Sequence, residues 1–231
     1  MNRPLLSVVL PCRNQADHIV RVLESYASPL EALDGGYELV VVPNACTDLT
    51  PRIVAGLAEN DPHLRAVPIA LGGWGRAVLA GLSAARGQWL CYANSARTDP
   101  EHIPALLALV RTQGEAVAKV RRERRGAPLR ELGSWLYNLE ARLLFGIRVR
   151  EVNGTPKVLP RTLYDRFALG SEDDLLDLEL LAKAHRRNVP ILEMPVEGFK
   201  RHGGRSSTGF RSAWRMYSGA IALRARLREG P

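Results

Sequence analysis

The sequence predicts an α/β protein with a mainly parallel central sheet and flanking helices. Short apolar runs that end at a proline or a polar loop are typical of buried strands, and they occur at Leu6–Leu10, Leu39–Val42 and Trp89–Tyr92. Longer segments with helical apolar spacing separate these runs. Strand–helix alternation of this kind favours a parallel sheet, because each crossover helix returns the chain to the same edge.

The first half of the chain supplies the other elements expected around these strands. Apolar spacing predicts a helix over Ala16–Tyr26, and Asp48 or Thr50 is suited to cap the next helix, with Pro51 in its first turn. Ala66–Ile69 is a weaker strand. The remaining expected elements are a helix from Gly72–Gly75 to about Ala85, a helix near Pro100, a helix over Leu129–Phe145, a helix near Asp174–His185, a strand at Val189–Met194 and a helix from about Phe210.

Composition limits the class of protein. The 231 residues are 46% hydrophobic and 24% charged, which excludes disordered, collagen-like and disulfide-stapled classes. We expect one domain over residues 1–209 and a basic helical extension over 210–231. The net charge of +8 favours anionic partners, namely nucleotide phosphates, an anionic membrane surface or nucleic acid. No zinc-finger, RNP or helix-turn-helix pattern occurs, so we expect no nucleic acid.

The cysteines and the hydropathy pattern indicate the compartment. Cys12, Cys46 and Cys91 show no metal-ligand or CxxC spacing, which is typical of reduced thiols. The amino terminus lacks the apolar stretch of a signal peptide, and no 18-residue apolar run is present. We therefore expect a cytoplasmic protein, with a peripheral position at the inner membrane left open.

Several motifs in order resemble family 2 glycosyltransferases. Ser7–Gln15 (SVVLPCRNQ) is similar to the first motif of that family, and Val41–Thr50 (VVPNACTDLT) to the second. Gly73-Trp74-Gly75 with Gly81, Ala85 and Gly87 is similar to the third, and Thr98–Glu101 to the segment after the D-x-D motif. The polyprenyl- and dolichyl-phosphate sugar transferase branch is resembled by Val152–Val158, Asp177–Leu181, Met194–Val196, Arg201 and Gly204–Ser206. The resemblance covers roughly residues 5–210.

This resemblance implies a GT-A fold and inverting transfer of a sugar from a nucleotide sugar, with a D-x-D metal neutralising the leaving diphosphate. The donor lies at the carboxyl ends of the strands, where α/β sheets bind ligands. The expected nucleotide-binding residues are Pro11, Arg13, Asn14, Gln15, Asn44, Gly73, Gly75, Arg76, Asn94 and Ser95.

The departures from the family pattern fall on this chemistry. Ala93-Asn94-Ser95 stands where D-x-D is expected, so no carboxylate is available for Mg²⁺ or Mn²⁺, and the sequence predicts no metal ligand while leaving either cation open. Gln15, Asn44 and Trp74 are also neutral, at positions where the family pattern has Glu, Asp and Lys. Amides can still bind a base edge or ribose, which indicates a retained pocket with altered charge. The guanidinium groups of Arg13, Arg76 and Arg97 are candidates to replace the metal.

The acceptor side falls in the later half of the chain. Asp177 and Glu179 are the candidate catalytic bases, and because two residues on a helix point about 200° apart, only one can face the site. A polyprenyl phosphate acceptor needs no base, because its second pKa near 6 leaves it ionised. The expected acceptor- or phosphate-binding residues are Arg97, Asn153, Lys157, Arg201, Arg205 and Ser206.

A basic run, Lys119–Arg125, precedes the amphipathic helix Leu129–Phe145. Together they favour an interfacial membrane helix, with a helix packed on the sheet and a solvated basic face as the alternative. A homodimer interface formed by this helix is a third alternative. We expect a glycosyltransferase-like protein acting on a lipid phosphate or small polar acceptor, with metal independence open. The alternatives are a catalytically silent nucleotide-, lipid- or partner-binding member and a homodimeric scaffold.

Overall fold

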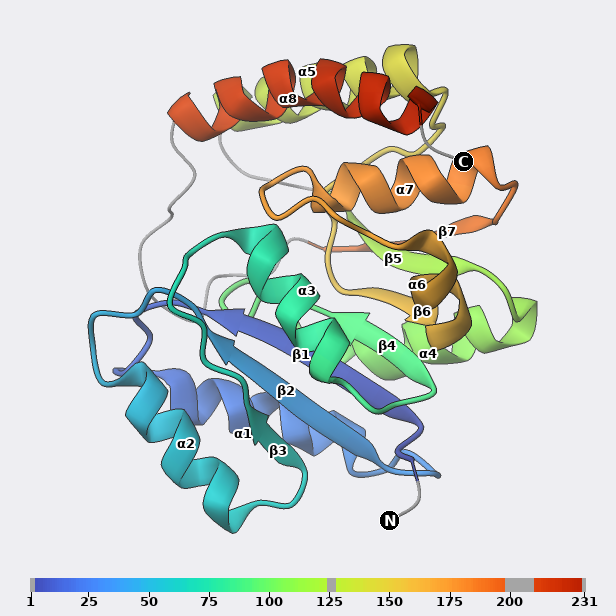
Figure 1. Cartoon of the computed structure of the whole chain (residues 1–231). Coiled ribbons are helices and arrows are strands. Elements are labelled where there is room, and N and C mark those ends of the chain that lie inside the picture. The colour runs from blue at the N-terminus through green and yellow to red at the C-terminus, as the bar shows by residue number, and fades with distance from the viewer. Residues whose placement is uncertain (1–2, 124–127, 198–209, 230–231) are drawn as a thin grey trace.

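A seven-stranded sheet in the order β3-β2-β1-β4-β6-β5-β7 runs through the molecule (Figure 1). The computed structural model describes residues 3–123, 128–197 and 210–229. The strands are β1 Leu6–Cys12, β2 Tyr37–Pro43, β3 Leu64–Ala66, β4 Trp89–Tyr92, β5 Val117–Arg122, β6 Lys157–Pro160 and β7 Ile191–Val196. Strand β6 runs antiparallel to β4 and β5, and the other pairs are parallel. The α/β class and the mainly parallel sheet are therefore confirmed.

Helices cover both faces of this sheet (Figure 1). They are α1 Ile19–Leu30, α2 Thr50–Asn60, α3 Trp74–Ala84, α4 His102–Gln113, α5 Pro128–Phe145, α6 Arg161–Phe167, α7 Leu176–Arg186 and α8 Phe210–Glu229. Helices α1, α2 and α4 pack on one face, and α3, α6 and α7 on the other. Helices α5 and α8 lie side by side over α7 as an outer layer.

Alternate residues of the central strands face opposite layers. On β1, Val9 packs with the α3 side and Val8 and Leu10 with the α1 side, all fully buried. Burial on both faces explains why these strands are continuous apolar runs. Helix α3 approaches the sheet so closely that a Cβ at Gly81 would collide with the Val9 side chain.

Two expected boundaries differ from the observed ones for identifiable reasons. The first helix begins at Ile19, three residues later than expected, and Ala16 instead donates its N–H to Asp48 Oδ2 at 3.0 Å. The third strand is Leu64–Ala66 rather than Ala66–Ile69. The chain still follows β2 beyond it, because Val67 N–H donates to Val41 and Ile69 N–H to Pro43. Pro68, between them, has no N–H for the ladder.

The interpretation of Lys119–Arg125 as a basic run at a membrane or in solvent is wrong for its first residues, because they belong to strand β5. Lys119 is fully buried and ion-paired with Glu193, and Arg122 is ion-paired with the buried Glu151. These two residues are therefore not a solvated or membrane-facing run. Residues 124 and 125 lie outside the described part of the chain.

The expected extension over residues 210–231 contains α8. Its residues Ala220, Leu223 and Leu227 are buried in the same core cluster as residues of α7. The Nη2 group of Arg226 also donates to Ser171 Oγ at 2.8 Å. Helix α8 thus packs on the body of the protein through both apolar and polar contacts.

Candidate functional site at the carboxyl ends of the strands

The loops that follow β1, β2 and β4 are joined by buried polar side chains. Gln15 Nε2 donates to Ser95 Oγ at 3.0 Å, and Ser95 Oγ donates to the carbonyl of Pro11 at 3.0 Å. Asn44 Nδ2 donates to the carbonyl of Cys12 at 2.9 Å. The structure therefore brings these expected site residues together, and it uses much of their hydrogen-bonding capacity within the protein.

Asn14 and Asp48 shape the outer part of this edge. Asn14 is exposed with a left-handed φ of 50°, a conformation that asparagine tolerates, and its Oδ1 accepts the Thr47 N–H at 2.8 Å. Asp48 accepts the N–H groups of Ala16 and Thr50, each at 3.0 Å. Desolvation acts to raise the pKa of Asp48, but these hydrogen bonds outweigh it and hold that pKa below its ordinary value.

Ala93-Asn94-Ser95 forms a compact turn where the metal-binding motif is expected. Asn94 Oδ1 accepts the Ala96 N–H at 3.1 Å, while the Asn94 carbonyl accepts the N–H groups of Arg97 and Thr98. The residues described contain no group of three His, Cys, Asp or Glu side chains suited to a metal ion. This donor set does not fit a divalent cation, which needs carboxylate oxygens beside the phosphate.

The first amides of α3 are already paired. Gly75 N–H donates to the Asp173 carbonyl at 3.1 Å and Arg76 N–H to the Glu172 carbonyl at 2.8 Å. A Cβ at Gly75 would collide with the carbonyl oxygens of Ser171 and Asp173. Gly75 and Arg76 are among the expected nucleotide-binding residues, and the structure shows that the segment 171–173 covers their backbone amides.

Two of the three candidate arginines meet at Gly72. Arg76 Nη1 donates to the Gly72 carbonyl at 3.0 Å, and its Nε donates to Glu172 Oε2 at 3.0 Å. Arg13 is exposed, and a Cβ built on Gly72 would lie 3.7 Å from Arg13 Nη1. Arg97 lies on the turn after β4 and is half-buried. The glycine-rich turn therefore collects two guanidinium groups from separate elements.

Asp177 lies at the centre of a buried cluster on the α3 side of the sheet. It is 4% exposed, and it accepts hydrogen bonds from Trp74 Nε1 at 3.2 Å, Tyr92 Oη at 2.8 Å and Lys157 Nζ at 2.5 Å. Lys157 is fully buried, and its ammonium also lies 5.5 Å from the centre of the Tyr92 ring. Burial, followed by the charge of Asp177, raises the pKa of Tyr92 and keeps it a neutral donor.

Glu179 faces a different part of the molecule. Its carboxylate accepts the N–H groups of Gly170 and Ser171, the latter at 2.7 Å, and pairs with Lys183 Nζ at 2.6 Å. Desolvation acts to raise the pKa of Glu179, but the bonds from Lys183 and Ser171 outweigh it and lower that pKa. Glu179 thereby anchors the loop that reaches α3, while Asp177 faces β4 and β6.

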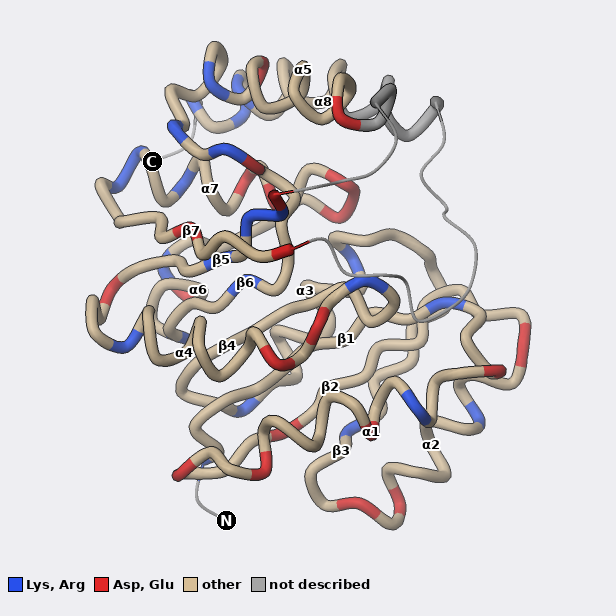
Figure 2. The backbone as a smooth tube through the Cα atoms, turned by 180° about the vertical axis from the view of Figure 1, so that it is seen from behind, with Lys and Arg blue, Asp and Glu red and all other residues tan. Residues whose placement is uncertain are grey.

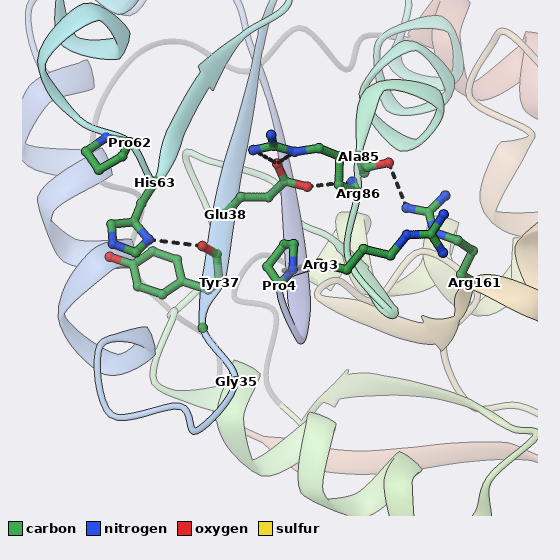
Figure 3. Close-up of a pocket in the computed structure, with 11 residues that line it drawn as sticks. Arg3, Pro4, Gly35, Tyr37, Glu38, Pro62, His63, Ala85, Arg86 and Arg161 are labelled. Atoms are coloured by element: carbon green, nitrogen blue, oxygen red, sulfur yellow. Dashed lines mark hydrogen bonds and ion pairs between the residues drawn. The ribbon is translucent and has the colours of Figure 1, made fainter. Parts of the chain in front are cut away.

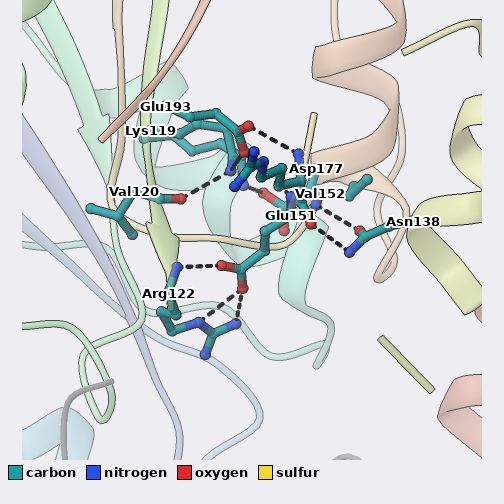
Figure 4. Close-up of polar contacts among 10 residues, drawn as sticks. Lys119, Val120, Arg122, Asn138, Glu151, Val152, Asp177 and Glu193 are labelled. Carbon is teal, nitrogen blue, oxygen red and sulfur yellow. Dashed lines mark hydrogen bonds and ion pairs between the residues drawn. The ribbon is translucent and has the colours of Figure 1, made fainter. Parts of the chain in front are cut away.

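A second polar network, which the sequence reasoning did not find, lies beside this cluster (Figure 4). Lys119 Nζ contacts Glu193 Oε1 at 3.2 Å and the Val120 carbonyl at 2.9 Å, and Glu151 pairs with Arg122. Burial, followed by the charge of Lys157, lowers the pKa of Lys119 to about 8. A lysine inside the apolar run of Val117–Val120 was the available signal.

The acceptor-side candidates are only partly placed. Asn153 is half-buried, and its Oδ1 atom is buried with no hydrogen-bond partner among the described residues. Arg201, Arg205 and Ser206 lie outside the residues that the structure describes.

The outer helical layer carries an exposed apolar stripe. On α5, Leu132, Trp135, Leu136 and Leu143 are 53%, 59%, 43% and 72% exposed. The other face of α5 buries Tyr137 and Ala141 against the core. Across the described ranges, no helix is long and apolar enough to cross a membrane.

The fold is shared with solved structures. Glucosyl-3-phosphoglycerate synthase from Mycobacterium tuberculosis, in complex with Mn²⁺, UDP and phosphoglyceric acid, is similar over 99% of this chain and 80% of its own, with a TM-score of 0.72 and 21% identity. This similarity shows that the chain has a GT-A fold.

Curated relatives cover most of this chain. The low-salt glycan biosynthesis hexosyltransferase Agl6 of Haloferax volcanii is 27% identical over 92% of the chain and 52% of the relative. An undecaprenyl-phosphate 4-deoxy-4-formamido-L-arabinose transferase of Shewanella sediminis is 24% identical over 90% of the chain and 63% of the relative. The chain therefore spans less than two thirds of the length of these relatives.

The family itself is shown by a match that spans most of the sheet. Residues 7–167, from the second residue of β1 to the end of α6, match the family model described as glycosyl transferase family 2. The strand-end motifs, the GT-A fold and this match agree, and the chain belongs to glycosyl transferase family 2.

Proposed function

We propose that the chain transfers a sugar from a nucleoside diphosphate to the phosphate of a polyprenyl phosphate, with inversion and without a divalent metal. The observation that carries this proposal is that both candidate bases are engaged. Asp177 accepts three hydrogen bonds in a buried cluster, and Glu179 anchors a loop through Lys183 and two backbone amides. Carboxylate oxygens that already accept these hydrogen bonds are not free to take a proton from an acceptor hydroxyl.

A phosphate acceptor removes the need for such a base. With a second pKa near 6, a phosphate monoester is largely dianionic at neutral pH and attacks without losing a proton. The bond formed joins a phosphate oxygen to the anomeric carbon, and the bond broken releases the nucleoside diphosphate. A neutral hydroxyl acceptor would instead require a free base within hydrogen-bond reach.

We propose that arginines stabilise the departing diphosphate. Arg13 and Arg76 lie beside Gly72, and a guanidinium binds phosphate oxygens in a fork without deprotonating. Arg76 would exchange its ion pair with Glu172 for the diphosphate. Arg97 is the third candidate. Pro11, Asn14, Gln15, Asn44, Gly73, Gly75, Asn94 and Ser95 are proposed to form the nucleotide side of the site.

The acceptor side is proposed to involve Asn153, Lys157, Arg201, Arg205 and Ser206. The buried and unpartnered Oδ1 atom of Asn153 supports a polar contact there. Lys157 is proposed to act through Asp177, because the two are already paired. The relative named as an undecaprenyl-phosphate transferase supports the choice of acceptor class.

The test is a transfer assay with undecaprenyl phosphate and UDP-, GDP- and dTDP-sugars, with and without EDTA. We expect product with at least one donor and a rate that EDTA leaves unchanged. Arg13→Gln and Arg76→Gln should each lower the rate about tenfold or more, because charge-assisted phosphate contacts are strong. Arg21→Gln, an exposed arginine on α1, is the matched control. Loss of activity in EDTA with recovery on Mn²⁺ would show that the metal-free part is wrong.

A catalytically silent binding role is the second candidate. It is favoured by the pairing of the α3 amides with Glu172 and Asp173, which leaves fewer donors for a diphosphate. A nucleotide that raises the melting temperature but is never consumed, with any of the three donors, would support this role over transfer.

We also propose that the exposed stripe of α5 rests on an anionic bilayer as a peripheral contact. Charge complementarity supports this occupant, because Arg142, Arg148 and Arg150 are exposed on α5 and the segment after it, and Arg228 is exposed on α8. A tryptophan within an apolar stripe beside arginines is typical of interfacial helices. A homodimer through the same stripe is the competing outcome.

A further inference from the structure

A pocket of about 420 Å³ lies at the amino ends of the central strands (Figure 3). The candidate transfer site lies at the carboxyl ends of the strands. The pocket lies at their opposite ends, because Tyr37 and Glu38 are the first residues of β2. The residues that give the pocket its chemistry are Arg3, Tyr37, Glu38, His63, Arg86 and Arg161. Its size falls within the range of small-molecule sites.

One of the three arginines is neutralised. Arg86 Nε donates to Glu38 Oε2 at 3.0 Å, and the Arg86 N–H donates to Glu38 Oε1 at 2.5 Å. Glu38 also accepts Ser7 Oγ at 2.6 Å and is 2% exposed. Glu38, the single carboxylate among the described lining residues, is therefore fully used by groups that are already present.

The other two arginines carry uncompensated charge. Arg161 donates through Nε to the Gly87 carbonyl at 2.8 Å and through Nη2 to the Ala85 carbonyl at 2.7 Å, and it has no ion pair among the described residues. Arg3 is exposed and has no polar partner in the part of the chain that the structure describes. Figure 3 shows the Arg3 side chain extending toward Arg161.

A stacked aromatic pair forms another part of the wall. The rings of Tyr37 and His63 are 4.7 Å apart and 14° from parallel, and His63 Nδ1 lies 3.1 Å from the Tyr37 carbonyl. Burial, followed by the charges of Glu31 and Asp61, raises the pKa of Tyr37, but neither carboxylate lines the pocket. Among the described residues that line the pocket, three arginines and one glutamate leave an excess of two positive charges.

We propose that this pocket binds a small molecule through a phosphate dianion. Two guanidinium groups match the charge of a dianion, and each can donate a pair of hydrogen bonds to its oxygens. The amino ends of β1 and β2, where the pocket lies, are at the opposite end of the molecule from α5 and α8 (Figure 1). A free phosphate compound is therefore favoured over a lipid headgroup.

The test is an NMR titration of the full chain with inorganic phosphate. We expect saturable shifts of the Gly36 and Arg86 amide signals, and none at Asn14 or Ala45 on the opposite edge. Arg3→Gln should weaken binding about tenfold, since it removes one charge-assisted contact. Arg65→Gln is the matched control, because Arg65 is exposed nearby, donates to the Ala84 carbonyl and does not line the pocket.

A second variant and a second probe complete the test. Arg161→Lys keeps the charge but loses the fork, so phosphate affinity should fall while unfolding stays cooperative. Equal affinities in the wild type, Arg3→Gln and Arg65→Gln would overturn the proposal. Shifts confined to Asn14 and Ala45 would also overturn it. If only vesicles containing phosphatidic acid perturb Gly36, the ligand is a headgroup and the free-phosphate assignment is wrong.

Discussion

At the scale of single residues, the buried pair of Lys157 and Asp177 gives the clearest stability prediction. Removing one partner leaves the other charge buried, so Lys157→Met and Asp177→Asn should each lower the free energy of unfolding by about 3–5 kcal/mol. The double variant should cost clearly less than the sum. Chemical denaturation measures all three. The exposed pair Arg166–Glu115 is the control, and Arg166→Met should cost less than about 1 kcal/mol. Additive costs at Lys157 and Asp177 would contradict the coupling.

Lys119 makes a separate prediction about pH. Its pKa is lowered from 10.5 to about 8 in the folded state, by burial first and by Lys157 second. Between these values the unfolded chain binds more protons than the folded protein, so this group makes stability rise as pH increases. Lys119→Met should remove that rise. Buried tyrosines and thiols change stability in the opposite direction, but they are present in both proteins. The difference in unfolding free energy between wild type and variant, measured from pH 8 upward, therefore isolates the contribution of Lys119. A constant difference would contradict this assignment.

The residue scale also shows the limit of sequence reasoning about the site. The motifs located the strand-end loops, and Gln15, Asn44 and Ser95 do lie there. Their partners could not be deduced, because Ser95 is 80 residues from Gln15 and Glu172 is 96 residues from Arg76. Local sequence patterns predict which residue types lie at the carboxyl ends of the strands. Which side chains pair there depends on distances in the folded structure.

At the scale of elements, the contact between α3 and the segment 171–173 depends on glycine. Gly75→Ala should lower the free energy of unfolding by about 1–3 kcal/mol, because its Cβ would overlap two carbonyl oxygens. Gly56→Ala on α2 is the matched control, since nothing lies within 4 Å of its Cβ, and it should raise stability by about 0.5–1 kcal/mol. Thermal and chemical denaturation provide the comparison. Equal effects of the two substitutions would show that the contact is not tight.

The elements that periodicity predicted are those whose residues are apolar on the buried side. The strand at Trp89–Tyr92 and the helix expected over Leu129–Phe145 agree with β4 and α5 to within a residue. Strand β5 was missed because Lys119 interrupts its apolar pattern, and β6 was missed because it has only 4 residues and begins with Lys157. Ion pairs with Glu193 and Asp177 offset the cost of burying the two lysine charges, and both carboxylates come from later parts of the chain.

At the scale of the whole molecule, the proposed bilayer contact of α5 predicts binding to anionic vesicles that depends on salt and on the apolar stripe. Figure 2 shows basic segments along the layer of α5 and α8, and each basic residue near an anionic surface contributes about 1 kcal/mol. The full chain should float with vesicles containing anionic phospholipid, and less so as salt increases. Leu136→Glu with Leu143→Glu should abolish flotation, because two charges enter the apolar stripe. Leu49→Glu, at a residue 62% exposed at the start of α2, should float like the wild type. If the double variant instead converts a dimer to a monomer and the wild type never floats, the stripe is an interface between two copies of the chain.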